Sequence, residues 1–195
     1  MAARENVVPV LLEKVYKLIQ DKLELAHQPL VTKLAKHLFS TIGQEDLVQR
    51  NESDLYGAVV SLWHHISEKQ PKEISVRVFN PTVSRHGWKS THTIVEIVVP
   101  DSPFLVDSVK MALARLDLSS HLMLHGPTRI DRDKNSNITG VNEKSGDNLS
   151  LFHIEVDIIR GLDQKFENRK KVFGFFHSLP FSLLLPLKGS TEGIK

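Results

Sequence analysis

The sequence contains no cysteine, has no excess of either charge and has no long apolar run. Without cysteine, its 195 residues can form neither a disulfide framework nor a thiolate site. The 25 basic and 23 acidic residues give a net charge of +2, too balanced to predict nucleic acid or a membrane surface as a partner. The N-terminal apolar stretch is broken by Pro9, Glu13 and Lys14 and is too short to span a bilayer. These absences predict a globular chain of one or two domains in the cytosol.

Recognised catalytic and nucleotide-binding motifs are also missing. The sequence has no nucleophile elbow, no phosphate-binding loop and no G-x-G-x-x-G. We therefore assign no catalytic and no cofactor-binding residue to this chain. RNA recognition by a sheet requires exposed aromatic residues, and the strand candidates Phe79 and Phe152 both suit a core. The sequence thus favours neither nucleic acid nor a membrane as a partner.

Residues 7–68 show the spacing of amphipathic helices. We expect Ser53 to cap the third helix, and Pro71 to end the helical region. The three apolar stripes consist of Leu11, Val15, Leu18 and Ile19; of Val31, Leu34, Leu38 and Phe39; and of Leu55, Val59, Leu62 and Ile66. Such stripes need partners, so the helices should pack on each other or on the sheet that follows.

From Ile74 onward the apolar period changes to two, which is typical of strands. The pattern predicts strands at 74–79, 93–99 and 151–158, a helix at 103–116 and a mixed β run interrupted at Gly126-Pro127. A polar loop at 131–148 suits a long hairpin tip. In strand 93–99, Val95, Ile97 and Val99 share one face, and Ile94, Glu96 and Val98 share the other.

This order predicts an α+β fold, in which an N-terminal helical segment precedes a ferredoxin-like βαββ(αβ) sandwich with helices on one face of an antiparallel sheet. The predicted divisions are 1–72, 73–158 and an atypical tail at 159–195. The final helix and strand should follow residue 160, but Gly174, Pro180 and Pro186 interrupt the pattern there. We therefore expect a loosely packed tail.

The histidines resemble a zinc site only in part. We expect His121 and His125 on one strand face, with His153 on a neighbouring strand. An H-x-x-x-H pair on a strand is too widely spaced to chelate without a bend. We interpret these histidines as solvated or hydrogen-bonded.

The polar loop begins like a calcium-binding loop. Asp131, Asp133, Asn135 and Asn137 give the spacing D-x-D-x-N-x-N, but Ser136 stands where such a loop requires glycine. A hairpin tip rich in turn-forming residues explains this run better. The sequence therefore predicts no metal site.

Several segments resemble the N-terminal region of the large bacterial NAD-specific glutamate dehydrogenases. The most specific are HGW-x-STHT at 86–93 and PFLVDSV at 103–109. The others are EDLVQRNESDLYGAVVSLW, VRVFNP, HLMLHGPTRIDRD and LFHIEVD. The resemblance runs from about Val7 to Asp157 and fades in the residues after it. It implies an ACT-like domain, a βαββαβ module that commonly binds amino-acid effectors or packs against other modules.

The resemblance implies a regulatory and assembly module of an enzyme that converts L-glutamate, NAD and water to 2-oxoglutarate, ammonium and NADH. It places NAD in the full-length family enzyme and no cofactor in this chain, which we expect to be inactive alone. The implied partners are other domains or subunits of the dehydrogenase and an amino-acid effector. Two alternatives stay open, a stand-alone amino-acid sensor acting in trans and a non-functional gene remnant. A frameshifted or truncated reading frame would explain the tail.

In ACT-like modules, effectors and partner subunits usually meet at the loop between the first strand and the first helix. Here the candidate residues are Asp101, Ser102, Pro103, Phe104, Asp107 and Ser108. Free N–H groups at the helix start favour a carboxylate, and Asp101 can hold an amino group. In the opposing interpretation, Ser102 and Asp107 are ordinary helix-end residues, Pro103 lies in the first turn and Phe104 is a core residue.

Overall fold

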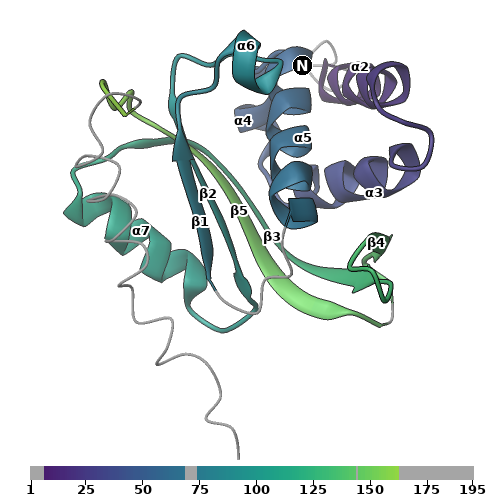
Figure 1. The fold of residues 1–195 in the computed structure, drawn as a ribbon. Helices are drawn as coiled ribbons and strands as arrows, with labels where there is room; N and C mark the ends of the chain where they lie inside the picture. Colours follow the sequence, from purple (N-terminus) through teal and green to yellow (C-terminus); the bar gives the residue numbers. More distant parts are fainter. Residues whose placement is uncertain (1–6, 69–73, 144, 163–195) are drawn as a thin grey trace, which may run out of the picture.

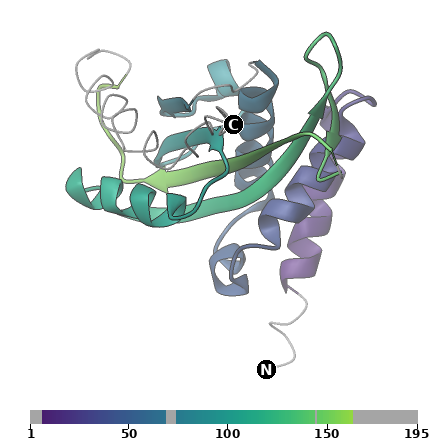
Figure 2. The same ribbon diagram turned by 90° about the horizontal axis from the view of Figure 1, so that it is seen from below.

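A five-stranded antiparallel sheet separates two layers of helices (Figure 1). The computed structural model describes residues 7–68, 74–143 and 145–162. One side of the sheet carries α2 (Val7–Lys22), α3 (Gln28–Phe39), α4 (Gln44–Val48) and α5 (Glu52–Glu68), and the other carries α7 (Leu105–Arg115). A view turned by 90° also shows α2 and α3 well away from α7 (Figure 2). The predicted α+β class is confirmed, but helices cover both faces of the sheet rather than one.

The strand order of the sheet is β1-β2-β5-β3-β4. Its members are β1 (Ser75–Phe79), β2 (Thr93–Pro100), β3 (Ser120–Arg132), β4 (Ile138–Val141) and β5 (Asp147–Val156). Gly126 and Pro127 do not interrupt β3, because they pair in register with Leu151 and Ser150 of the central strand β5. The predicted hairpin tip contains the short strand β4, which pairs with the end of β3.

The edge of the sheet beside β2 is filled by a strand that precedes the β2–α7–β3–β5 unit. In a ferredoxin-like sandwich, the strand after the second helix normally pairs with the first strand. Here β1 occupies that position, running antiparallel to β2 from Ser75 opposite Val98 to Phe79 opposite Ile94. The predicted closing helix and strand, like the predicted loose packing of the tail, concern residues that lie mostly outside the described ranges.

The core between α7 and the sheet confirms the alternation predicted for strand 93–99. Val95, Ile97 and Val99 of β2 face α7, whereas Val98 belongs to the core on the opposite side. The residues of this core are Val76, Val78, Val95, Ile97, Val99, Leu105, Val109, Ala112, Leu113, Phe152, Ile154, Val156 and Leu162. Burial of such a set is the main force that holds α7 on the sheet.

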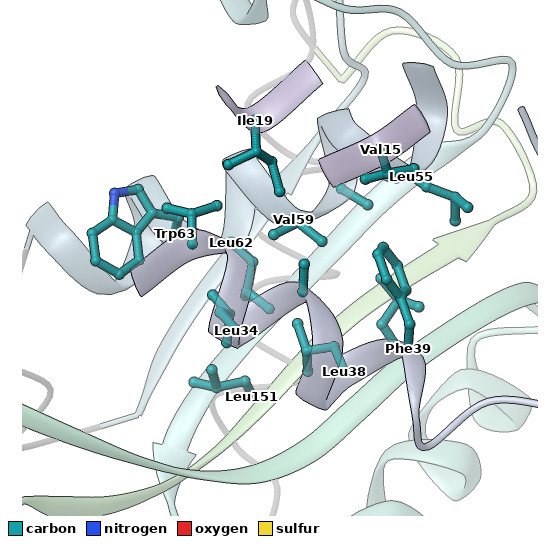
Figure 3. Packing of buried hydrophobic residues seen from close by; sticks show 14 of the residues in the cluster. Val15, Ile19, Leu34, Leu38, Phe39, Leu55, Val59, Leu62, Trp63 and Leu151 are labelled. Atoms are coloured by element: carbon teal, nitrogen blue, oxygen red, sulfur yellow. The ribbon is translucent and has the colours of Figure 1, made fainter. Parts of the chain in front are cut away.

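The second core joins the N-terminal helices to the other face of the sheet (Figure 3). Leu55, Val59 and Leu62 of the third predicted stripe lie on α5 and are almost fully buried. Leu34 on α3 and Leu151 on β5 belong to the same cluster. The predicted stripes therefore pack both on each other and on the sheet.

Two local predictions in the helical region and the loops are corrected. Helix α5 is capped by Asn51 rather than Ser53, because the backbone N–H of Asp54 donates to Asn51 Oδ1 at 2.8 Å. The connection between β1 and β2, a polar segment to which the sequence pattern assigned no element, contains the short helix α6 (Val83–His86), which ends at Gly87 with a left-handed φ of 75°.

Candidate functional site

The loop that joins β2 to α7 is fastened to the central strand through Asp101. The N–H of Asp101 donates to the Asn148 carbonyl at 2.9 Å. One carboxylate oxygen accepts from Asn148 Nδ2 at 3.1 Å, and the other accepts from the Ser150 hydroxyl. Both oxygens of Asp101 therefore have partners inside the chain, which fixes the start of the loop.

Phe104 is the most unusual residue of the loop. Its φ of 64° lies in the left-handed region, which is rare and strained for a bulky residue. Its side chain is 71% exposed, so the interpretation of Phe104 as a core residue is wrong. A large aromatic ring held in water by a strained backbone marks this loop as a candidate contact surface.

The left-handed residue also moves the start of the helix. Helix α7 begins at Leu105, and no side chain caps its N-terminus. Ser102 and Pro103 therefore lie before the helix instead of capping it and opening its first turn. Asp107 is exposed in the first turn, and the half-buried Ser108 donates its N–H to the Phe104 carbonyl at 3.0 Å. Thus the structure gathers the six predicted residues around one turn.

A hollow of about 690 Å³ opens beside this loop, and no sequence pattern predicted it. Its lining begins at Pro100, the residue before Asp101, and includes Asn148, which binds Asp101. Its charged lining residues are Asp131, Arg132, Asp133 and Asp147. Three carboxylates and one guanidinium favour a cationic or ammonium group in the hollow.

Strand β2 also carries a buried charge that sequence reasoning missed. Glu96 has no exposed surface, and it faces α5 from the middle of the sheet. Its Oε1 lies 3.1 Å from His153 Nδ1 on β5, and its Oε2 lies 3.3 Å from His65 Nδ1 on α5. Burial pushes the pKa of Glu96 up, but the two imidazoles outweigh burial and hold the pKa well below its usual value.

A second buried carboxylate, Glu155, lies on β5 two residues after His153. Glu155 forms an ion pair with Arg50, and its Oε2 lies 3.5 Å from His92 Nδ1. The His92 ring also packs against His121, whose Nε2 lies 2.8 Å from Asp157 Oδ1. These charges connect the end of the helical layer to the sheet. A signal was present in the sequence, since charged residues interrupt otherwise apolar strands.

The HGW-x-STHT segment fastens the β1–β2 connection to the rest of the fold. Trp88 is buried against α5, where a Cβ added to Gly57 would lie 2.4 Å from its ring. The Thr93 hydroxyl donates to Asn80 at 2.6 Å and accepts from the Ile159 N–H at 2.7 Å. Each of these contacts is structural, so the most distinctive segment of the sequence is part of the scaffold rather than of a reactive centre.

The structure corrects the expected arrangement of the histidines. His121 and His125 do not share a strand face, because a bulge between Ser120 and Leu122 breaks the alternation of β3. His125 instead packs against Phe152 in a tilted arrangement, with ring centroids 4.2 Å apart. Within the described ranges, no group of three or more histidine, aspartate or glutamate side chains can hold a metal ion.

The calcium-like run forms the turn that the hairpin-tip prediction requires. Asp133 Oδ1 accepts the N–H groups of Asn135 and Asn137, and Oδ2 accepts the Asn137 side-chain amide. These bonds hold the tip of the β3–β4 hairpin.

No helix within the part that the structure describes is long and apolar enough to cross a membrane.

The β2–α7–β3–β5 unit, its antiparallel sheet and the loop at the start of α7 define an ACT-like α+β module. A family model described as "Glutamate dehydrogenase, ACT1 domain" matches residues 34–167. The chain belongs to this family, and the resemblance recognised in the sequence is confirmed.

Two curated relatives are NAD-specific glutamate dehydrogenases. The protein of Halomonas elongata is 34% identical over 160 residues, which cover 80% of this chain and 10% of the relative. The protein of Pseudomonas aeruginosa is 38% identical over 134 residues, which cover 66% of this chain and 8% of the relative. The chain thus spans about a tenth of the length of these relatives. No solved structure matches it significantly.

Proposed function

We propose that this chain is a regulatory and assembly module of an NAD-dependent glutamate dehydrogenase. In this proposal, L-glutamate is oxidised to 2-oxoglutarate and ammonium, with NAD as the acceptor, by parts of the enzyme outside these 195 residues. The module works in the cytosol and contacts other domains or subunits through the loop at 100–108. Its small net charge favours neither nucleic acid nor a membrane as a partner.

The exposed ring of Phe104 carries this proposal. Aromatic side chains dominate the energy of protein contacts when a partner removes them from water. The ring projects from a left-handed residue, a conformation that costs about 1–2 kcal/mol for a residue with a side chain. Asp101 fixes the loop to β5, so Phe104 is presented from an ordered support. A partner surface that covers the ring would account for both the strain and the exposure.

A chimeric enzyme tests the contact. The region of the Pseudomonas aeruginosa dehydrogenase that matches this chain is replaced by the corresponding residues of this chain. Glutamate-dependent NADH formation and the sedimentation of the assembly are then measured. We expect Phe104→Asn to lower assembly or activity at least about tenfold, because asparagine tolerates the left-handed backbone but removes the ring.

Val83→Asn is the matched control. Val83 is 62% exposed on α6, and its replacement should leave assembly and activity at the level of the unmodified chimera. If Phe104→Asn behaves like Val83→Asn, the loop is structural and the contact proposal is wrong. A chimera that assembles but never forms NADH would support the alternative of a non-functional remnant.

The hollow beside Asp101 supports amino-acid binding as a second candidate. An α-amino group would suit its carboxylates, whereas the guanidinium of Arg132 already donates to the carbonyls of Ser136 and Ile66. Against a direct role for Asp101, both of its oxygens already accept hydrogen bonds. Calorimetry with glutamate, aspartate and 2-oxoglutarate on the wild type and on Asp147→Asn would decide. If none of the three binds at millimolar concentration, effector binding is excluded for this chain, whether in cis or in trans.

A further inference from the structure

Most of the outer edge of β3 has no neighbouring strand. On one side, β3 pairs with β5 from Ser120 to Ile130, whereas on its outer side it pairs with β4 only from Ile130 to Arg132. Among the described strands, none covers the outer edge between residues 121 and 128. Backbone groups on such an edge readily pair with a strand of another chain. The 13-residue strand β3 therefore requires something else to cover this edge.

Side chains of the helical layer reach the carbonyl groups that β3 directs away from β5. His37 Nε2 on α3 lies 2.8 Å from the Pro127 carbonyl, and this nitrogen is the donor because a carbonyl oxygen only accepts. The Thr41 hydroxyl, just after α3, lies 2.7 Å from the His125 carbonyl. It also lies 2.7 Å from the Leu38 carbonyl, so the two acceptors share its single hydrogen. Two outward carbonyls of β3 thus face side chains of this chain.

A third side chain reaches the same edge near the start of β3. Arg50 Nη2 donates to the His121 carbonyl at 2.6 Å, and Arg50 Nη1 pairs with the buried carboxylate of Glu155. The guanidinium is therefore held at the edge by two separate contacts. All three donors come from one continuous stretch of the chain, residues 37–50, which runs from the end of α3 past α4.

Two residues of β3 are suited to this contact. Pro127 has no N–H, so it removes an outward donor from the edge, and proline is tolerated in a sheet at just such a position. Gly126 allows α3 to approach, because an added Cβ there would lie 2.9 Å from His37 Nε2 and 3.6 Å from Leu38 Cδ2. A larger residue at position 126 would therefore push His37 away from the Pro127 carbonyl.

We propose that residues 37–50 form a cover that prevents the outer edge of β3 from pairing with the same edge of a second copy of this chain. Two identical strands can pair antiparallel about a twofold axis, so this edge is complementary to itself. Once uncovered, its carbonyls would accept hydrogen bonds from the N–H groups of the other copy. The cover leaves the loop at 100–108 as the contact surface of the module, but it acts whether or not that loop binds a partner.

Sedimentation of the full 195-residue chain tests the cover. The variant His37→Ala/Thr41→Val removes two of the three contacts and keeps the pair between Arg50 and Glu155. We expect this variant to self-associate at least about tenfold more tightly than the wild type, because two hydrogen bonds that compete with strand pairing are lost. Circular dichroism establishes that the variant is folded.

Lys36→Ala/Ser40→Ala is the matched control. It changes two exposed residues at the same end of α3, of which Lys36 lies over the Tyr16 ring and Ser40 donates to the His37 carbonyl. Neither contact involves β3. This control should therefore self-associate as weakly as the wild type.

A second proline locates the new contact on β3. Met123 lies two residues before His125, so its N–H also faces away from β5. Met123→Pro removes that donor, as proline already does at position 127, and it should return the His37→Ala/Thr41→Val variant to the weak self-association of the wild type. In the associated variant without this proline, exchange of the backbone amide hydrogens in residues 121–128 should slow.

The proposal is overturned if the folded His37→Ala/Thr41→Val variant self-associates no more tightly than the control, because the contacts then only pack α3 on the sheet. If that variant does not fold, Gly126→Ala takes its place, since it displaces His37 without removing a side chain of the cover. Association that Met123→Pro does not reverse also overturns the proposal. If Met123→Pro does not fold, unchanged amide exchange in residues 121–128 of the associated variant has the same meaning.

Discussion

The two sides of the sheet differ in the polarity of their buried side chains. Among the described residues, the buried carboxylates Glu96 and Glu155 lie on the side that faces α2–α5, and no buried carboxylate lies in the core under α7. Strand β2 contributes to both, because Ile97 points toward α7 and its neighbour Glu96 points toward α5. One strand therefore joins a non-directional apolar contact to a directional polar one.

This difference suggests different roles for the two contacts. Apolar packing supplies stability in proportion to buried area and tolerates changes of shape. The Glu96 contact requires His153 directly opposite it on β5 and His65 at one position on α5. A shift of one residue would move Glu96 to the α7 side and leave its charge unpaired. We infer that the polar side fixes the register of the helical layer, while the α7 side supplies bulk stability.

The largest expected effect comes from the apolar side. Ile97→Ala should lower the free energy of unfolding by about 2–5 kcal/mol, because the fully buried side chain leaves a cavity between β2 and α7. Urea unfolding at pH 5 and at pH 8 should give the same loss. A strongly pH-dependent loss would show that the two sides of the sheet are not energetically distinct.

Substitution of the neighbouring residue Glu96 should cause a smaller loss of stability, and that loss should depend on pH. Glu96→Gln should cost about 1.5–3 kcal/mol near neutral pH, since it removes a charged acceptor from two imidazoles. Because the pKa of folded Glu96 lies below its unfolded value, its contribution is present above about pH 4.3 and is lost as the pH falls. The free energy of unfolding should therefore fall less steeply with decreasing pH in the variant than in the wild type. Parallel curves would contradict the ionised state of Glu96.

Gly57, which lies against the Trp88 ring, and Gly87, its neighbour in sequence, test how closely the helical layer is packed. An added Cβ at Gly57 would lie 2.4 Å from Trp88 Cδ2, so Gly57→Ala should destabilise by about 1–3 kcal/mol. At Gly87 an added Cβ meets nothing within 4 Å. Gly87→Ala should therefore cost only about 1 kcal/mol, which is the strain of an alanine at the left-handed φ of 75°. Thermal unfolding of both variants would measure the difference. A gain in stability from Gly57→Ala, as in an exposed helix, would show that Trp88 moves easily.

The smallest effect should have the opposite sign. Phe104→Gly should raise the free energy of unfolding of the isolated chain by about 0.5–1 kcal/mol, because glycine adopts the left-handed backbone without strain. The exposed ring contributes little that the substitution could remove. Denaturant unfolding of the chain alone is the measurement. A clear loss of stability would mean that the ring packs within the chain rather than awaiting a partner.

Local patterns in the sequence predicted the elements well. The alternation in 93–99 assigned Val95, Ile97 and Val99 to one face correctly, because side-chain direction in a strand follows a period of two. The helical stripes were equally informative, because residues at helical spacing share one face. The start of α7 was misplaced because the left-handed conformation of Phe104 leaves no trace in composition or spacing.

Long-range pairing could not be predicted in the same way. Nothing local in Ser75–Phe79 says that this strand fills the edge beside β2, since that depends on a partner about 20 residues away. The same limit hid the buried site. The alternation placed Glu96 on the face opposite to that of Val95, but it could not show what covers that face. Glu96 became a core residue once α5 was found to cover that face.

The position of β5 has a consequence for how the chain folds during synthesis. Among the described strands, β5 is the last to leave the ribosome, yet it lies between β2 and β3. Until Asp147–Val156 has emerged, the β1–β2 and β3–β4 hairpins each retain an unpaired inner edge, and such edges readily join other chains. Closure then requires contacts distant in sequence, such as Thr93 with Val156, which are slow to form. A nascent chain stalled before Asp147 would therefore be a preferred client for a chaperone.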